Sequence, residues 1–218
     1  RRGFLRVADD HLPDDAEAVL AGTAGTLVAR HVALRARKRA GDADELVVER
    51  LDGGRELAWT QLVIATGSRI VPEAIPHFTE EAHHFYTAEA AASLRAALDA
   101  FTGGKVVIGI AGMPYKCPPA PLEVAFLIEA ELRERGLRER TTLDYCSPIG
   151  RAFTIESVSE MATPILEQKG IELHTFFNVE TIDASRRVIG SLEGEELAYD
   201  LLILVPPHRG AQLVIDSG

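Results

Sequence analysis

Residues 105–110 read Lys-Val-Val-Ile-Gly-Ile, and residues 121–135 follow with apolar side chains at helical spacing. The short apolar run, rich in β-branched side chains, predicts a buried strand, and the spacing predicts an amphipathic helix. Two more predicted strands, at 141–146 and 171–176, enclose a second predicted helix at 156–169. Strands that alternate with helices in this way predict a parallel βαβαβ sheet with right-handed crossovers.

Strand patterns of a different kind lie on both sides of this unit. Residues 26–36 and 45–51 alternate polar and apolar side chains, and Asp52-Gly53-Gly54 separates the second run from the strand-like residues 56–59. The Asp-Gly-Gly sequence is a tight-turn signal. The alternation predicts a β-meander, and residues 178–192 predict another.

The two meanders belong to an internal repeat. Residues 56–67 read Glu-Leu-Ala-Trp-Thr-Gln-Leu-Val-Ile-Ala-Thr-Gly and align without gaps on residues 196–207, Glu-Leu-Ala-Tyr-Asp-Leu-Leu-Ile-Leu-Val-Pro-Pro, at an offset of 196 − 56 = 140. Only the second copy has a complete βαβαβ unit before it. We therefore expect an interior part of a longer polypeptide, with a further βαβ unit before Arg1. A self-contained small domain is the alternative.

Composition limits the function classes. The 218 residues are 46% hydrophobic with a net charge of −10, which indicates a globular protein and argues against a nucleic-acid surface, because phosphates require clustered Lys and Arg. No run reaches the roughly 18 apolar residues of a membrane-spanning helix. Cys117 and Cys146 are 146 − 117 = 29 positions apart, a spacing that indicates neither a disulfide scaffold nor a zinc site, and we assign no metal.

Residues 113–121, Met-Pro-Tyr-Lys-Cys-Pro-Pro-Ala-Pro, stand between the first predicted strand and its helix. A dinucleotide-binding domain has its glycine-rich phosphate loop at this place, and the fingerprint Gly-x-Gly-x-x-Gly is absent here. Lys116 and the helix N-terminus favour the thiolate form of Cys117, and Pro118 stiffens the segment. The residues alone leave two interpretations open, a reactive Cys117 and an inert buried cysteine. Cys146 is expected to pack in the core.

Three stretches resemble a known family. Residues 62–69, Leu-Val-Ile-Ala-Thr-Gly-Ser-Arg, resemble the Ala-Thr-Gly strand that closes the FAD domain of flavoproteins with two dinucleotide-binding domains. Residues 115–123 resemble the cysteine segment of sulfide:quinone oxidoreductases and flavocytochrome c sulfide dehydrogenases, and residues 200–209 resemble the exit of their second domain. The sequence is thus similar to this branch of the pyridine nucleotide-disulfide oxidoreductase superfamily.

The resemblance implies a domain organisation. The fold class is α/β: a Rossmann-like parallel βαβαβ sheet with a β-meander, plus the end of a preceding FAD-type domain. Residues 1–80 would form the last part of the FAD domain and residues 81–104 a connecting segment with a helix. Residues 105–218 would form a second dinucleotide-type domain that carries Cys117.

The resemblance also implies a function. The enzyme would be a flavin-dependent oxidoreductase that oxidises sulfide or related sulfur species through a catalytic cysteine and FAD, and passes electrons to a quinone or a cytochrome. Residues 82–87 lack the further cysteine that the family has near this position, so the partner sulfur is left open. The implied residues are Cys117 as the catalytic cysteine, Ala65, Thr66 and Gly67 as FAD contacts, and Lys116, Pro118 and His208 as site neighbours.

Other expectations concern location and activity. We expect a cytoplasmic protein. Peripheral attachment to a membrane through regions outside these residues and self-association are left open. We expect this stretch alone to be inactive and to retain FAD weakly. An FAD-dependent NAD(P)H or disulfide oxidoreductase is an alternative, weakened by the missing glycine fingerprint and the missing Cys-x-x-Cys pair. A truncated α/β binding module without catalysis is another.

Overall fold

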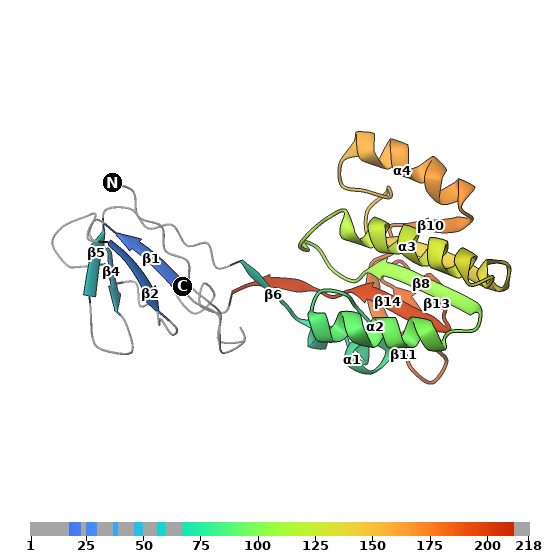
Figure 1. Ribbon diagram of the computed structural model, residues 1–218, viewed down its shortest axis with the longest axis horizontal. Coiled ribbons are helices and arrows are strands. Elements are labelled where there is room, and N and C mark those ends of the chain that lie inside the picture. The colour runs from blue at the N-terminus through green and yellow to red at the C-terminus, as the bar shows by residue number, and fades with distance from the viewer. Residues whose placement is uncertain are drawn as a thin grey trace. The chain divides into compact units, whose positions relative to one another are not determined.

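The computed structural model describes residues 67–211 without a break and, before them, five strands (Figure 1). The chain divides into two compact units, residues 1–69 with 210–218 and residues 70–209. The five early strands belong to the first unit: β1 (Ala18–Gly22), β2 (Gly25–Ala29), β3 (Arg37–Lys38), β4 (Leu46–Glu49) and β5 (Glu56–Trp59).

The described strands of the first unit form two antiparallel sheets. β4 pairs with β5, so the predicted hairpin across Asp52-Gly53-Gly54 is confirmed, and β3 completes a three-stranded sheet. β2 overlaps the strand predicted over residues 26–36, of which residues 30–36 lie outside the described ones, and it pairs with β1, which the sequence pattern did not reveal. The buried strand predicted over residues 62–65 lies outside the described residues.

The second unit is built on a five-stranded parallel sheet with the order β10-β9-β8-β14-β7. All five residues of the strand Leu201–Val205 are buried, as are the last five of Gly104–Ile110. Parallel sheets are covered on both faces, which explains why these strands are continuous apolar runs. The strands are β7 (Ala82–His83), β8 (Gly104–Ile110), β9 (Thr141–Ser147), β10 (Ile171–Thr175) and β14 (Leu201–Val205).

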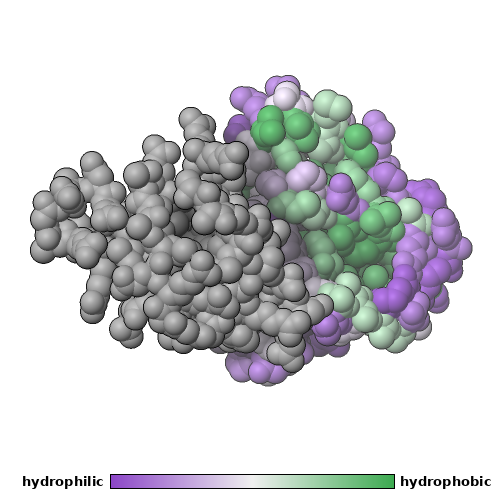
Figure 2. Space-filling model, turned by 60° about the vertical axis from the view of Figure 1, so that its left-hand side comes forward, coloured by the Kyte–Doolittle hydropathy of each residue, from purple (hydrophilic) through white to green (hydrophobic). Residues whose placement is uncertain are grey.

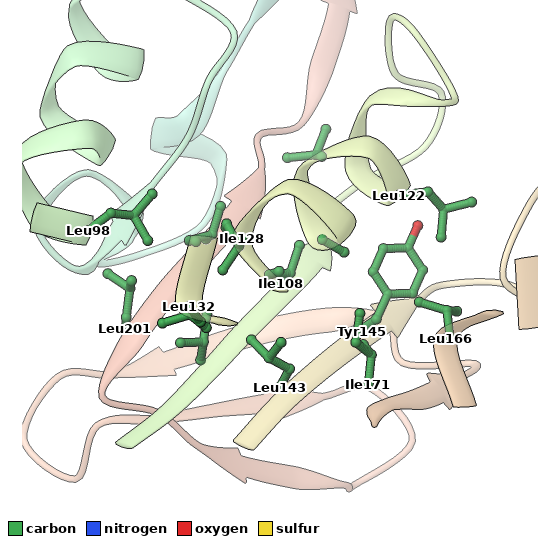
Figure 3. Close-up of a cluster of buried hydrophobic side chains, with 14 of the residues drawn as sticks. Leu98, Ile108, Leu122, Ile128, Leu132, Leu143, Tyr145, Leu166, Ile171 and Leu201 are labelled. Atoms are coloured by element: carbon green, nitrogen blue, oxygen red, sulfur yellow. The ribbon is translucent and has the colours of Figure 1, made fainter. Parts of the chain in front are cut away.

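Helices α2 (Ala88–Ala100), α3 (Ala120–Glu134) and α4 (Glu156–Gln168) pack on one face of this sheet. Figure 3 shows the resulting core, in which Leu98, Ile128 and Leu166 of the helices meet side chains of the strands. The predicted helices and strands of the βαβαβ unit are confirmed, with bounds that differ from the prediction by one residue.

A meander and a short helix cover the other face. Phe78, Ile189 and Leu197 lie there in one buried cluster with Val107 and Leu204 of the sheet. The predicted second meander is confirmed. The elements on this face are α1 (Phe78–Glu81), β11 (Val179–Asp183), β12 (Val188–Ser191) and β13 (Glu196–Ala198), and the 3-10 turns η1 (Pro72–Ala74) and η2 (Arg138–Arg140) complete the unit.

The internal repeat is visible in the strands. β5 and β13 are both the third strand of a three-stranded antiparallel sheet, and their first residues are 196 − 56 = 140 positions apart. The offset continues: β6 (Ser68–Ile70) and β15 (His208–Gly210) are 208 − 68 = 140 positions apart and pair with each other. The chain therefore passes between its two units through two paired strands that are equivalent in the repeat.

Candidate functional site

Cys117 lies in the loop between β8 and α3, which we call the cysteine loop (residues 111–119). Its side chain is exposed, and its backbone has the left-handed value φ = 54°. A residue with a Cβ avoids this region unless its surroundings fix it. The Cys117 carbonyl accepts a hydrogen bond from the Ala120 N–H (3.0 Å), at the first residue of α3. This bond holds the cysteine against the start of the helix.

Tyr86 holds the cysteine loop from the other side. Its hydroxyl donates a hydrogen bond to the Lys116 carbonyl at 2.7 Å, so the peptide units before and after Cys117 both have a partner. Tyr115 adds a longer contact from its hydroxyl to the Pro118 carbonyl, at 3.5 Å. Burial, and secondly the negative charge of a Cys117 thiolate, raise the pKa of both phenols. Both hydroxyls therefore stay protonated and remain donors.

His208 is the buried neighbour of this group, with 8% of its surface exposed. Its ring meets the Tyr86 ring edge to face, with 5.0 Å between the centroids. Its Nδ1 lies 2.8 Å from the Pro206 carbonyl oxygen, which can only accept, so Nδ1 carries the hydrogen. Burial lowers the pKa of His208, and the Lys116 charge lowers it further against the opposing effect of the Pro206 bond. The imidazole is therefore neutral at neutral pH.

The sheet brings these segments together. β8 and β14 are neighbours, with Ile110 opposite Val205, so the cysteine loop and the exit that carries His208 leave from the same edge. At Gly112 an added Cβ would lie 3.2 Å from Pro207 Cβ, so the small glycine permits close contact between the two exits. In open α/β sheets, ligands bind at the carboxyl ends of the strands, where neighbouring connections diverge. This edge is the candidate site.

The structure locates some of the predicted site residues, and their roles stay predictions. Lys116, Cys117 and Pro118 share the cysteine loop, and His208 joins them through Tyr86. Gly67 is exposed and left-handed at φ = 72°, with no atom within 4 Å of an added Cβ. The other predicted FAD contacts, Ala65 and Thr66, lie outside the described residues.

Tyr86 is the site residue that the sequence pattern did not reveal. It lies 30 positions before Lys116 and has no motif around it. Its position follows from the pairing of β7 with β14, which places the segment after β7 beside the second exit. Of the two histidines before it, His83 and His84, both are half-buried, and His83 is part of β7.

A second polar cluster lies between the sheet and its meander. His174 Nε2 is 3.0 Å from Asp144 Oδ1, and His174 Nδ1 is 2.9 Å from Glu195 Oε1. Lys105 Nζ approaches the other oxygen of buried Asp144 at 2.9 Å. Asp144, Glu172 and His174 also place possible metal-binding atoms within 4.8 Å of one another. Because Asp144 and His174 already have charged partners, we interpret the cluster as an ion-pair network.

Among the described residues, a hollow lies on the meander of the second unit, and its lining includes Asp183, Arg186 and Glu196. Arg186 and Glu196 form an ion pair across it at 2.6 Å. None of its lining residues belongs to the cysteine loop or to the exit that carries His208. The hollow is therefore separate from the candidate site.

Two curated relatives that match this chain have the same name. No family model matches the chain. The mitochondrial sulfide:quinone oxidoreductase of Mus musculus is 24% identical over 169 residues, which are 72% of this chain and 38% of the relative. That of Dictyostelium discoideum is 23% identical over 179 residues, 75% of this chain and 38% of the relative. The chain is sulfide:quinone oxidoreductase-like. It spans somewhat more than a third of the length of these curated relatives.

Solved structures give the same fold. The sulfide:quinone oxidoreductase of Aquifex aeolicus superposes with a TM-score of 0.63 at 22% identity, over 85% of this chain and 44% of that one. An NAD-dependent persulfide reductase from A. fulgidus superposes with a TM-score of 0.53 at 19% identity, over 86% of this chain and 32% of that one. The expected fold class is confirmed: a Rossmann-type α/β sheet of the kind found in these oxidoreductases.

Proposed function

We propose that this sulfide:quinone oxidoreductase-like chain is part of an FAD-dependent enzyme that oxidises sulfide or related sulfur species through Cys117. The observation that carries the proposal is an exposed cysteine, fixed on both sides by hydrogen bonds, at the carboxyl edge of a Rossmann-type sheet. Sequence similarity to sulfide:quinone oxidoreductases supports the same assignment. Within the chain, residues 1–80 would serve the FAD domain and residues 105–218 the domain that presents the cysteine.

Gly67 is the predicted FAD contact that the structure describes. Gly67 offers an exposed backbone without a side chain, which lets a planar ligand approach closely, and Ala65 and Thr66 would extend this contact. When bound, FAD would supply a two-electron acceptor. The cysteine loop would hold the sulfur in place, since Pro118 and Pro119 limit its backbone.

Cys117 would hold the reacting sulfur. When bound, FAD would take up the two electrons that are released as sulfide sulfur is oxidised to sulfane sulfur or polysulfide at Cys117. Cys146 is fully buried in the core on the meander side, and burial raises its pKa well above the usual range. It is therefore unsuited as the partner sulfur, and we infer that the partner is not one of the described residues.

The start of helix α3 argues against the alternative function, an FAD-dependent NAD(P)H or disulfide oxidoreductase. A helix that binds a pyrophosphate needs free N–H groups at its start. Before and within the first turn of α3, Pro118, Pro119 and Pro121 have no N–H group, and the Ala120 N–H is bonded to Cys117. A water-forming NADH oxidase has a similar fold, with a TM-score of 0.51 at 16% identity, so the fold alone does not decide between the two functions.

The test uses full-length protein. We expect the purified protein to show flavin absorbance, anaerobic sulfide to bleach it, and NADH to leave it unchanged. Absence of flavin would contradict the proposal, and bleaching by NADH but not by sulfide would favour the alternative.

A quinone or a cytochrome is the proposed electron acceptor. Among the described residues, no helix is long and apolar enough to cross a membrane. A cytoplasmic location, attachment to a membrane surface and self-association are proposals that fractionation and size measurements on the full-length protein would test.

A further inference from the structure

His208 has a buried nitrogen without a hydrogen-bond partner among the described residues. This nitrogen is Nε2. Because Nδ1 donates to the Pro206 carbonyl, Nε2 of the neutral ring carries a lone pair and can only accept. A buried polar atom without a partner costs free energy. A ligand that donates a hydrogen bond would recover this cost.

The position of this atom connects it with Cys117. The Tyr86 ring packs against the His208 ring, and the Tyr86 hydroxyl holds the carbonyl of Lys116, the residue before the cysteine. Gly112 and Pro207 are in close contact, which keeps the cysteine loop against the exit that carries His208. These contacts place His208 in the group of side chains that packs against the cysteine loop.

We propose that His208 is a catalytic base of the Cys117 site, whose Nε2 accepts the proton of a sulfhydryl donor, either hydrogen sulfide or an organic thiol. The inference rests on the proposed function and adds a proton acceptor to it. In the step, the S–H bond breaks and an N–H bond forms at Nε2, while the sulfur keeps the electron pair as an anion. No electron is transferred, and the imidazolium later returns its proton to solvent.

The surroundings of His208 suit this role. Among the described residues, the charged group that acts on its pKa is Lys116, in the cysteine loop, and His208 in turn lowers the pKa of His84, in the segment before α2. Burial and the Lys116 charge lower its pKa, so the ring is neutral and able to accept at neutral pH. The Lys116 charge also favours the release of the proton from the imidazolium once it has formed.

The test compares variants of the full-length flavoprotein in rapid mixing with sodium sulfide. His208→Asn keeps a donor for the Pro206 carbonyl and removes Nε2. We expect flavin reduction at neutral pH to slow about 100-fold, a usual contribution of a general base, and to recover at higher pH, where sulfide is already ionised. The control is His77→Asn, an exposed histidine outside the site at φ = 62°, a value that asparagine tolerates. An unchanged rate and pH profile in His208→Asn would overturn the inference and leave the proposed function standing.

A second variant covers the case in which His208→Asn folds poorly. Lys116→Gln removes the positive charge that acts on His208, so the pH at which activity is lost in acid should move upward. An acid limit that stays unchanged in this variant would contradict the assignment of that limit to His208.

Nuclear magnetic resonance of isotope-labelled histidines gives a readout without turnover. The His208 signal, assigned by its loss in His208→Asn, should shift when anaerobic sodium sulfide or 2-mercaptoethanol is added, and the effective compound identifies the donor class. A shift without flavin bleaching would support the base and overturn the proposed function. No shift with either compound would overturn the base.

Discussion

At the scale of single residues, two histidines of the second unit have opposite environments. We assign His208 to the chemistry of the candidate site and His174 to the stability of the fold. His208 has a carbonyl on one nitrogen and, among the described residues, no hydrogen-bond partner on the other, so its neutral form is favoured. His174 has a carboxylate on each nitrogen, Asp144 on one and Glu195 on the other, so both nitrogens must donate and the ring is charged. Neither state follows from the sequence, because the partners of His174 are 30 and 21 positions away.

His174 makes stability depend on pH. Burial opposes its charge, but the bonds to Asp144 and Glu195 outweigh burial and raise its pKa above 6.5. A folded-state pKa above the unfolded value gives a contribution that is complete below the unfolded value and is lost as pH rises through the folded value. Urea unfolding should therefore show a free energy of unfolding that falls as pH rises from about 6.5.

The matched variant is His174→Gln, which keeps hydrogen bonds and removes the charge. We expect its free energy of unfolding to lose this part of the pH dependence, and the exposed control His77→Asn to keep it. Equal slopes in wild type and His174→Gln above pH 6.5 would contradict the charged state of His174.

At the scale of elements, α3 carries its own buried charge. Glu129 has no exposed side-chain surface, and it accepts hydrogen bonds from Lys169 Nζ at 2.7 Å and from the Arg133 guanidinium. Burial acts against the carboxylate, but these bonds outweigh it and lower the pKa of Glu129. The pair with Lys169 connects α3 to the end of α4, which fixes the two helices on the sheet.

Replacement of Glu129 by Ala should lower the free energy of unfolding by about 2 kcal/mol, since the buried partner is lost while Arg133 and Lys169 can still reach water. Thermal or urea unfolding measures the change. Glu134→Ala, at an exposed position at the end of the same helix, is the control and should change stability by less than about 0.5 kcal/mol. A similar loss in both variants would show that the buried pair adds nothing specific.

Helix α4 shows where sequence patterns mislead. The helix was predicted from its spacing, yet it buries the small Ser159 and Ala162 together with Leu166. Apolar side chains also reach the surface of the second unit (Figure 2), and among the exposed ones Met161 and Ile165 belong to this helix. An apolar stripe predicts a helix, but the side that faces the sheet depends on how closely the helix can approach, and small residues allow the closest approach.

At the scale of the whole molecule, the sequence predicted the parallel sheet and the second meander because both depend on local patterns: continuous apolar runs, helical spacing and turn residues. It did not predict that β6 pairs with β15, although the two strands are equivalent in the repeat. It also did not predict Tyr86 in the site. Both depend on contacts between segments far apart in the chain, which no local pattern records.

The central claim is that Cys117 handles sulfur beside a flavin. The most direct measurement is flavin absorbance during anaerobic mixing of the full-length protein with sulfide, for wild type, Cys117→Ser and the buried-cysteine control Cys146→Ser. We predict that wild type and Cys146→Ser bleach and that Cys117→Ser keeps its flavin but does not respond. Bleaching of Cys117→Ser at the wild-type rate would contradict the account.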